Sequence, residues 1–184
     1  MGDQGSQGVF SPFLRSRRIR AALPFLRGRV LDFGCGAGAL AAHVPPDRYA
    51  GVDRDAAALE EARRRFPHHR FLTELPAGEL FDTIAALAVV EHMRDPAGWL
   101  EHLRSWLAPE GRIVLTTPHP AFRRIHETGA RFGWFSQEAA DEHEEMLDRA
   151  ALVRVAAAAS LRMTLYRRFL FGANQLAVLE LSQG

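Results

Sequence analysis

The 184-residue chain contains no lysine, and all 23 of its basic side chains are arginine. With 22 acidic residues the formal net charge is +1, which gives no electrostatic case for a nucleic-acid partner. The arginines at positions 15, 17, 18 and 20, and those at 63–65, are therefore interpreted first as solvated helix faces.

Cysteine is almost absent too, since Cys35 is the single one; this excludes an intrachain disulfide and is typical of a reducing compartment. No apolar run approaches a membrane-spanning length, and the first residues lack the basic and apolar regions of a signal peptide. We therefore expect a cytoplasmic protein with no membrane partner. The length allows one well-buried core and not two, which predicts a disordered tail over residues 1–10 and one domain over 11–184.

A glycine-rich turn is the most informative feature that is present. The apolar segment 30–33 runs into three alternate glycines, Gly34, Gly36 and Gly38. Alternate glycines let a flat polar ligand lie against main-chain N–H groups. The spacing also satisfies a relaxed dinucleotide fingerprint, but Asp32 just before the turn would repel a pyrophosphate and suits a positively charged ligand.

A second carboxylate follows about twenty residues later. The short apolar segment 49–52 ends in Asp53, where a carboxylate could accept both hydrogen bonds of a ribose diol. The alternative for Asp53 is a turn or helix-capping role.

Four segments in this order resemble the class I S-adenosylmethionine-dependent methyltransferases. They are 30–38, 51–55, 81–92 and 107–115. The resemblance is nearest to the small ubiquinone-biosynthesis-like O-methyltransferases, which have a Glu-His pair after the fourth strand and a Thr-Pro pair after the fifth. Here these are Glu91-His92 and Thr117-Pro118. The resemblance implies S-adenosyl-L-methionine as the cofactor.

The implied fold is an α/β, doubly wound, Rossmann-like sheet, mostly parallel, with a C-terminal antiparallel hairpin. An ordinary dinucleotide-binding fold continues parallel instead, so the hairpin also argues against a nicotinamide oxidoreductase. The sequence pattern predicts strands at 29–33, 49–52, 69–72, 83–89, 112–116, 163–170 and 175–181, and helices at 11–26, 36–44, 56–66, 99–107 and 148–159.

In such a sheet the ligand lies beyond the carboxyl ends of the central strands. We expect the adenine to lie between Arg54 and the segment after the third strand, and the end of the fourth strand to line the methionine portion. The expected cofactor-binding residues are Asp32, Gly34, Cys35, Gly36, Gly38, Asp53, Arg54, Glu74, Leu75, Ala88 and Val89.

Methyl transfer needs placement, exclusion of water and, for a protonated nucleophile, a base. His92 is the candidate base because it follows the fourth strand; the alternative is a structural histidine. Glu91 is expected to be a first-turn carboxylate or the partner of an arginine. Acceptor contacts are expected from His119, Phe122 and Trp134, in a segment that could equally be a lid packed on the core.

The histidine spacing after the fifth strand fits no compact ligand pattern, so no metal is expected. The chain also lacks the Asn/Asp-Pro-Pro-aromatic run of enzymes that methylate bases or glutamine. The sequence therefore predicts a methyltransferase that O- or N-methylates a small molecule. The alternatives are a non-catalytic S-adenosylmethionine-binding regulatory or partner protein and, third, an NAD-binding oxidoreductase.

Overall fold

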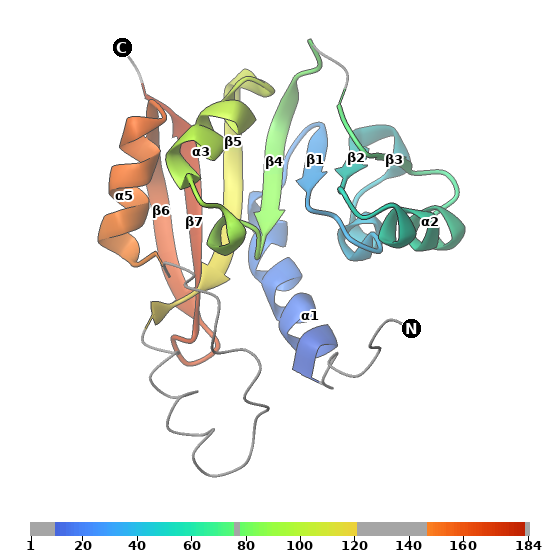
Figure 1. The fold of residues 1–184 in the computed structure, drawn as a ribbon, viewed down its shortest axis with the longest axis horizontal. Coiled ribbons are helices and arrows are strands. Elements are labelled where there is room, and N and C mark those ends of the chain that lie inside the picture. The colour runs from blue at the N-terminus through green and yellow to red at the C-terminus, as the bar shows by residue number, and fades with distance from the viewer. Residues whose placement is uncertain (1–9, 76–77, 121–146, 183–184) are drawn as a thin grey trace.

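The computed structural model of the chain describes residues 10–75, 78–120 and 147–182. Within these ranges a seven-stranded sheet has the order β3-β2-β1-β4-β5-β7-β6 (Figure 1). The strands are β1 Val30–Phe33, β2 Tyr49–Val52, β3 Arg70–Leu72, β4 Phe81–Leu87, β5 Leu107–Pro118, β6 Leu161–Phe169 and β7 Asn174–Leu181.

The sheet is parallel from β3 to β5, and β7 is antiparallel to both β5 and β6. This confirms the predicted class I methyltransferase fold with its C-terminal antiparallel hairpin. In register, Val30 of β1 lies between Tyr49 of β2 and Thr83 of β4. The carboxyl ends of these central strands therefore meet at one edge of the sheet.

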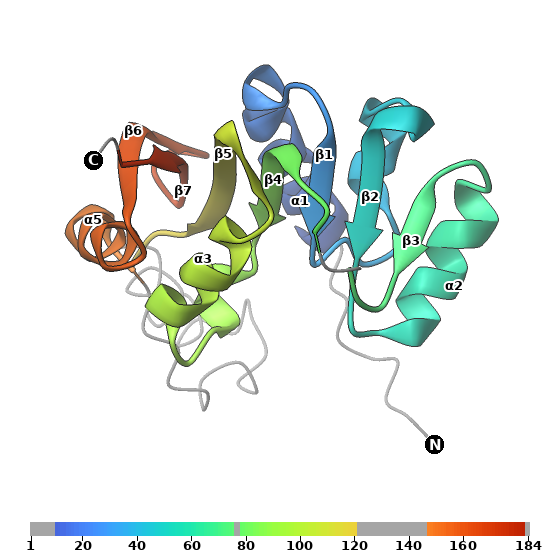
Figure 2. The same ribbon diagram turned by 90° about the horizontal axis from the view of Figure 1, so that it is seen from above.

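Helices cover both faces of the sheet. The α-helices are α1 Phe10–Ala22, α2 Ala56–Arg65, α3 Pro96–Arg104 and α5 Arg149–Ala158, and the short 3₁₀ helices are η1 Leu23–Phe25, η2 Ala39–His43, η3 Pro46–Arg48 and η4 Val90–His92. Helices α3 and α5 pack with Leu31 and Ile84 into one core cluster, whereas Ile19 of α1 packs with Val30 on the opposite face (Figure 2). Figure 1 shows α1 extending past the edge toward which β1 and β4 point.

Two elements at this edge differ from the predicted ones. The helix expected over 36–44 is only a five-residue 3₁₀ helix, because Gly38 at its N-cap is left-handed (φ +75°) and Pro45 follows soon after. Strand β4 ends at Leu87 rather than at residue 89. Ala88 has a φ of +63°, which turns the chain away from the sheet. Residues 1–9 of the expected tail lie outside the described part, and α1 begins at Phe10.

Candidate cofactor site

The glycine turn is tied to β2 by its own backbone. The N–H groups of Gly34 and Cys35 both donate to the carbonyl oxygen of Val52, at 2.8 and 3.1 Å. A Cβ added at Gly34 would lie 2.7 Å from a methyl carbon of Val89, but one added at Gly36 would meet nothing within 4 Å. Of these two glycines, Gly36 is therefore the one whose missing side chain leaves open space.

Asp32 is a buried carboxyl at the start of this turn, with 4% of its surface exposed. Its Oδ2 accepts a hydrogen bond of 2.8 Å from the hydroxyl of Tyr49 at the start of β2. Burial raises the pKa of Asp32 to about 7, helped by the nearby charge of Asp53 and opposed by the Tyr49 hydrogen bond. A cation placed beside Asp32 would favour its ionised form.

Asp53, directly after β2, lies against the glycine turn. Its Oδ2 accepts from the N–H of Gly36 at 2.7 Å and its Oδ1 accepts from the N–H of Asp55 at 3.0 Å. Asp55 is the residue that caps α2, accepting from the N–H groups of Ala57 and Ala58. Each oxygen of Asp53 keeps a further lone pair for a ligand hydroxyl.

A cavity of about 330 Å³ opens at the carboxyl ends of β1 and β4. Among the predicted site residues it brings together six, which come from the first strand, the glycine turn and the segment after β4. Its lining consists of Arg15, Arg18, Ile19, Asp32, Gly34, Cys35, Gly36, Ala37, Ala39, Leu40, Leu87, Ala88 and His92.

The other predicted cofactor residues do not line this cavity: Gly38, Asp53, Arg54, Glu74, Leu75 and Val89. Arg54 and Glu74 are exposed, and Leu75 is half-buried against the core. The expected adenine position between Arg54 and Glu74 therefore stays a prediction.

Cys35 faces the cavity, but its chemistry is unreactive. Burial, together with the negative charges of Asp32 and Asp53, raises the pKa of the Cys35 thiol well above its ordinary value. A protonated thiol is a poor nucleophile. Cys35 therefore helps to form the cavity wall and is not expected to act as a nucleophile.

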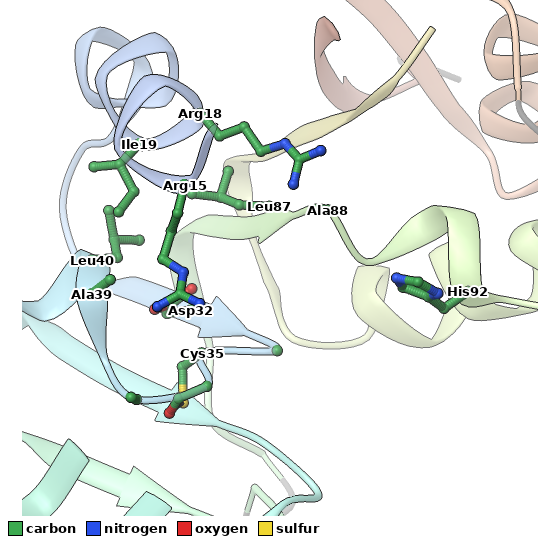
Figure 3. A pocket seen from close by; sticks show the side chains of 13 residues that line it. Arg15, Arg18, Ile19, Asp32, Cys35, Ala39, Leu40, Leu87, Ala88 and His92 are labelled. Atoms are coloured by element: carbon green, nitrogen blue, oxygen red, sulfur yellow. Dashed lines mark hydrogen bonds between the residues drawn. The ribbon is translucent and has the colours of Figure 1, made fainter. Parts of the chain in front are cut away.

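Two arginines of α1 also line the cavity, and neither was predicted from the sequence to do so. Arg15 is exposed, as the interpretation of a solvated face expects, whereas Arg18 is half-buried and does not fit that interpretation. The two are three residues apart and so project from one side of the helix. Figure 3 shows Arg15 extending toward Asp32, and Arg18 extending past Leu87 toward the side where His92 lies. The three-residue spacing of Arg15 and Arg18 indicates that they share one side of a helix. It does not indicate which side of the helix faces the site.

The Glu-His pair lies in η4, directly after the turn at Ala88. His92 is exposed and lines the cavity. Glu91 is buried, with 8% of its surface exposed, and its Oε2 has no hydrogen-bond partner among the described residues. Burial raises the pKa of Glu91, and a backbone hydrogen bond and the positive charge of Arg18 oppose this. No ion pair joins Glu91 to an arginine among the described residues, so its expected role as the partner of an arginine stays a prediction.

Of the residues predicted to contact the acceptor, His119 is described and Phe122 and Trp134 lie outside the described residues. The N–H of His119 donates to the carbonyl oxygen of Ala173 at 2.9 Å, which places His119 beside the β6–β7 turn. Burial and the charge of Arg168 lower the pKa of His119. His119 does not line the described cavity.

Two other kinds of feature are absent from the described residues. No helix in the described ranges is long and apolar enough to cross a membrane. In the same ranges no three histidine, cysteine, aspartate or glutamate side chains are grouped as metal ligands.

The residues around the cavity fit the amino-acid end of S-adenosylmethionine. Asp32 could pair with its ammonium group and Arg15 with its carboxylate, while the open space over Gly36 lets the ligand approach the backbone. Asp53 lies next to that backbone, at the position expected for the ribose of the cofactor.

Comparison with known proteins agrees with this geometry. A family model described as a methyltransferase domain matches residues 11–165. The chain is 32% identical over 117 residues to the ubiquinone biosynthesis O-methyltransferase of Cereibacter sphaeroides, over 55% of this chain and 45% of that protein. It is 31% identical over 119 residues to the trans-aconitate 2-methyltransferase of Paracidovorax citrulli, over 57% and 46% of the two chains. The chain thus spans under half the length of these curated relatives.

Among solved structures, the magnesium protoporphyrin IX methyltransferase of Synechocystis PCC 6803 is similar, with a TM-score of 0.71 at 18% identity, over 98% of this chain and 90% of that one. It was crystallised with bound S-adenosylhomocysteine (SAH), the demethylated form of the cofactor. The chain therefore belongs to the methyltransferase domain family, whose cofactor is S-adenosylmethionine, and has the class I methyltransferase fold.

Proposed function

We propose that this protein transfers the methyl group of S-adenosylmethionine to an oxygen or nitrogen atom of a small molecule. The proposal rests on one observation: Asp32, Arg15 and Gly36 line the same cavity, and the space beside the Gly36 backbone is open. Together they match the ammonium, the carboxylate and the close approach that the cofactor requires. The names of the two curated relatives, which refer to ubiquinone biosynthesis and to trans-aconitate, support a small-molecule acceptor.

The bound cofactor supplies an electrophilic methyl group, so this chain has to position the acceptor and exclude water. Ala88 helps to shape the site, since its left-handed backbone (φ +63°) turns η4 toward the cavity. A non-glycine residue in this conformation costs about 1–3 kcal/mol and persists where the surroundings enforce it. Here that turn places His92 at the cavity.

His92 is proposed as the base that takes the proton of an acceptor hydroxyl or amine. Its exposure at the cavity leaves it accessible to an incoming acceptor. Asp32 does not suit this task as well, because the cofactor ammonium would hold it ionised and occupied. Glu91 is buried and does not line the cavity, so we assign it no proton transfer.

Transfer of label tests this function while the acceptor is still unidentified. Purified protein is incubated with methyl-labelled S-adenosylmethionine and an extract of the source cells, which is then separated into small molecules and macromolecules. We expect label in the small-molecule fraction, where mass spectrometry identifies the acceptor. Label confined to protein or nucleic acid would contradict the proposal, and SAH binding without any transfer would indicate a non-catalytic binding protein.

Once the acceptor is known, His92→Ala tests the base. Its turnover should fall by roughly 10²- to 10⁴-fold while the Kd for SAH stays the same. His68→Ala is the matched control, because His68 is exposed after α2 and does not line the cavity. Unaltered turnover in His92→Ala would remove the base from the mechanism.

A further inference from the structure

The cavity carries two guanidinium groups, whereas the cofactor has one carboxylate. Arg15 extends toward Asp32 and the glycine turn, where the amino-acid end of the cofactor fits (Figure 3). Arg18 extends in another direction, past Leu87 and toward the side of His92. Arg18 is therefore a second cationic position, on the side of the cavity where the acceptor would meet the base.

The guanidinium of Arg18 is held in position by residues that do not line the cavity. Its Nε donates a hydrogen bond of 2.9 Å to Oδ1 of Asn174, the first residue of β7, which is 3% exposed. The buried carboxyl of Glu91 acts on Arg18 electrostatically, and its Oε2 has no hydrogen-bond partner in the described ranges. Asn174 thus fixes the orientation of the guanidinium, and Glu91 compensates part of its charge.

The described part of the chain leaves the two terminal nitrogens of Arg18 without a hydrogen-bond partner. Within the described residues, the Nε contact with Asn174 is the one hydrogen bond that its guanidinium makes, and Nη1 and Nη2 pair with no carboxylate. Burial lowers the pKa of Arg18, yet a guanidinium stays protonated in proteins. A half-buried cation whose terminal nitrogens pair with none of the described residues matches a carboxylate or phosphate with two parallel hydrogen bonds.

We propose that Arg18 binds an oxyanion of the methyl acceptor, a carboxylate or a phosphate, and so selects acidic acceptors. This inference rests on the proposed methyltransferase function. It assigns Arg15 to the cofactor and Arg18 to the acceptor, with Asn174 and Glu91 as positioning residues for Arg18. Neutral analogues of the acceptor should bind poorly, because they would leave the Arg18 charge without a partner.

Calorimetric titration of the SAH-saturated protein with simple anions tests this assignment. The probes are acetate, benzoate and inorganic phosphate, with benzamide as the neutral match of benzoate. Wild-type protein should bind at least one of these anions and should bind benzamide much more weakly. Arg18→Gln should raise the anion Kd by about 10- to 100-fold, the range for a hydrogen-bonded charge. A preference for benzoate or for phosphate shows which oxyanion the site fits.

Two further variants show whether a loss of anion affinity comes from the charge of Arg18, from the planar geometry of its guanidinium or from misfolding. Arg17→Gln removes an exposed arginine of the same helix that does not line the cavity, and its anion affinity should equal that of the wild type. Arg18→Lys keeps the charge and loses the fork, so its affinity should lie between those of Arg18→Gln and wild type. It also keeps the proposal testable if Arg18→Gln fails to fold.

The Kd for SAH in the same variants tells cofactor contacts from acceptor contacts. Arg15→Gln should weaken SAH by about tenfold or more, and Arg18→Gln should leave it within about twofold. Equal weakening of SAH by both variants would assign Arg18 to the cofactor and overturn the inference. Failure of the wild-type SAH complex to bind any anion, or anion binding unchanged in Arg18→Gln, would also overturn it. Failure of the wild-type protein to bind SAH would instead refute the proposed function itself.

Discussion

Gly36 is the residue at which one added side chain would fill the proposed cofactor position. Gly36→Val should abolish SAH binding, because the branched Cβ would occupy the open space in the cavity. Backbone strain also follows, since Gly36 has a φ of +50°, and should cost about 1–3 kcal/mol of stability.

Gly78→Val separates these two effects. Gly78 also has a left-handed backbone (φ +85°) and open space around its Cβ, but it does not line the cavity. It should lose similar stability in urea unfolding and keep wild-type SAH affinity. Normal affinity in folded Gly36→Val would show that the turn does not contact the cofactor.

Asp53 and Asp55 are neighbouring carboxylates with different expected roles. Asp53→Ala should weaken S-adenosylmethionine by about 10- to 100-fold, through loss of the ribose contacts and of the hydrogen bond from Gly36. Asp55→Ala removes the N-cap of α2 and should cost about 1 kcal/mol of stability with little change in affinity. Calorimetry and urea unfolding on both variants measure this split, and an unchanged Kd in Asp53→Ala would remove Asp53 from the ribose.

Asp32 should make cofactor binding depend on pH. Its pKa is raised from 3.8 to about 7 in the folded protein, so below pH 7 the cavity holds a neutral carboxyl. Because the cofactor ammonium favours the ionised form, binding should release a proton, and SAH affinity should rise from pH 6 to pH 8, by at most about tenfold per pH unit below 7.

The same shift has the opposite effect on stability. Between pH 3.8 and about 7 the folded state binds a proton that the unfolded state has lost, so the contribution of Asp32 to stability falls as pH rises through this window. Tyr49→Phe removes the hydrogen bond that lowers this pKa, and should move the SAH binding profile to higher pH. Calorimetry from pH 6 to 8.5 in two buffers counts the released protons; affinity independent of pH would contradict this role of Asp32.

At the scale of elements, the β6–β7 turn is strained. Leu170 and Phe171 both have positive φ values, 52° and 53°, and Phe171 is fully exposed. The N–H of Gly172 donates to the carbonyl oxygen of Phe169, which closes a β-turn with Leu170 and Phe171 at its centre, inside the four-residue connection between β6 and β7. Asparagine and glycine are favoured at such left-handed turn positions. The double substitution Leu170→Asn, Phe171→Gly should therefore raise the free energy of unfolding by about 1–2 kcal/mol.

Urea unfolding of this variant measures the gain. Phe13→Ala removes another exposed phenylalanine, one that has helical backbone in α1, and should change stability by less than about 0.5 kcal/mol. A loss of stability in the double variant would show that the Phe171 side chain packs against part of the chain.

The sequence predicted elements best where local residues determine them. The apolar strands and the glycine turn follow from patterns within a few residues, and the antiparallel hairpin followed from its two β-rich runs. The end of β4 was not predicted correctly, because an alanine such as Ala88 gives no indication in the sequence of a left-handed backbone. The helix expected after the glycine turn is shortened by the left-handed Gly38, where an added Cβ would lie 3.0 Å from the Phe71 ring and 3.2 Å from the Cβ of Ala62.

At the scale of the whole molecule, the site depends on contacts that the sequence does not show. Asp32, Gly34 and Gly36 were predicted from the motif and meet in one cavity. Arg15 and Arg18 were not, because α1 has arginines in several directions and tertiary packing of Ile19 decides which of them reach the site. The role of Asp53 as acceptor for the Gly36 N–H likewise needs two strands brought together.

The cavity at the carboxyl ends of β1 and β4 is proposed to hold S-adenosylmethionine. Calorimetric titration of the purified wild-type protein with S-adenosylmethionine, SAH and NADH tests this proposal most directly. We predict that the first two bind with one molecule per chain and that NADH does not bind, because Asp32 would repel its pyrophosphate. Binding of NADH without binding of S-adenosylmethionine or SAH would contradict the account.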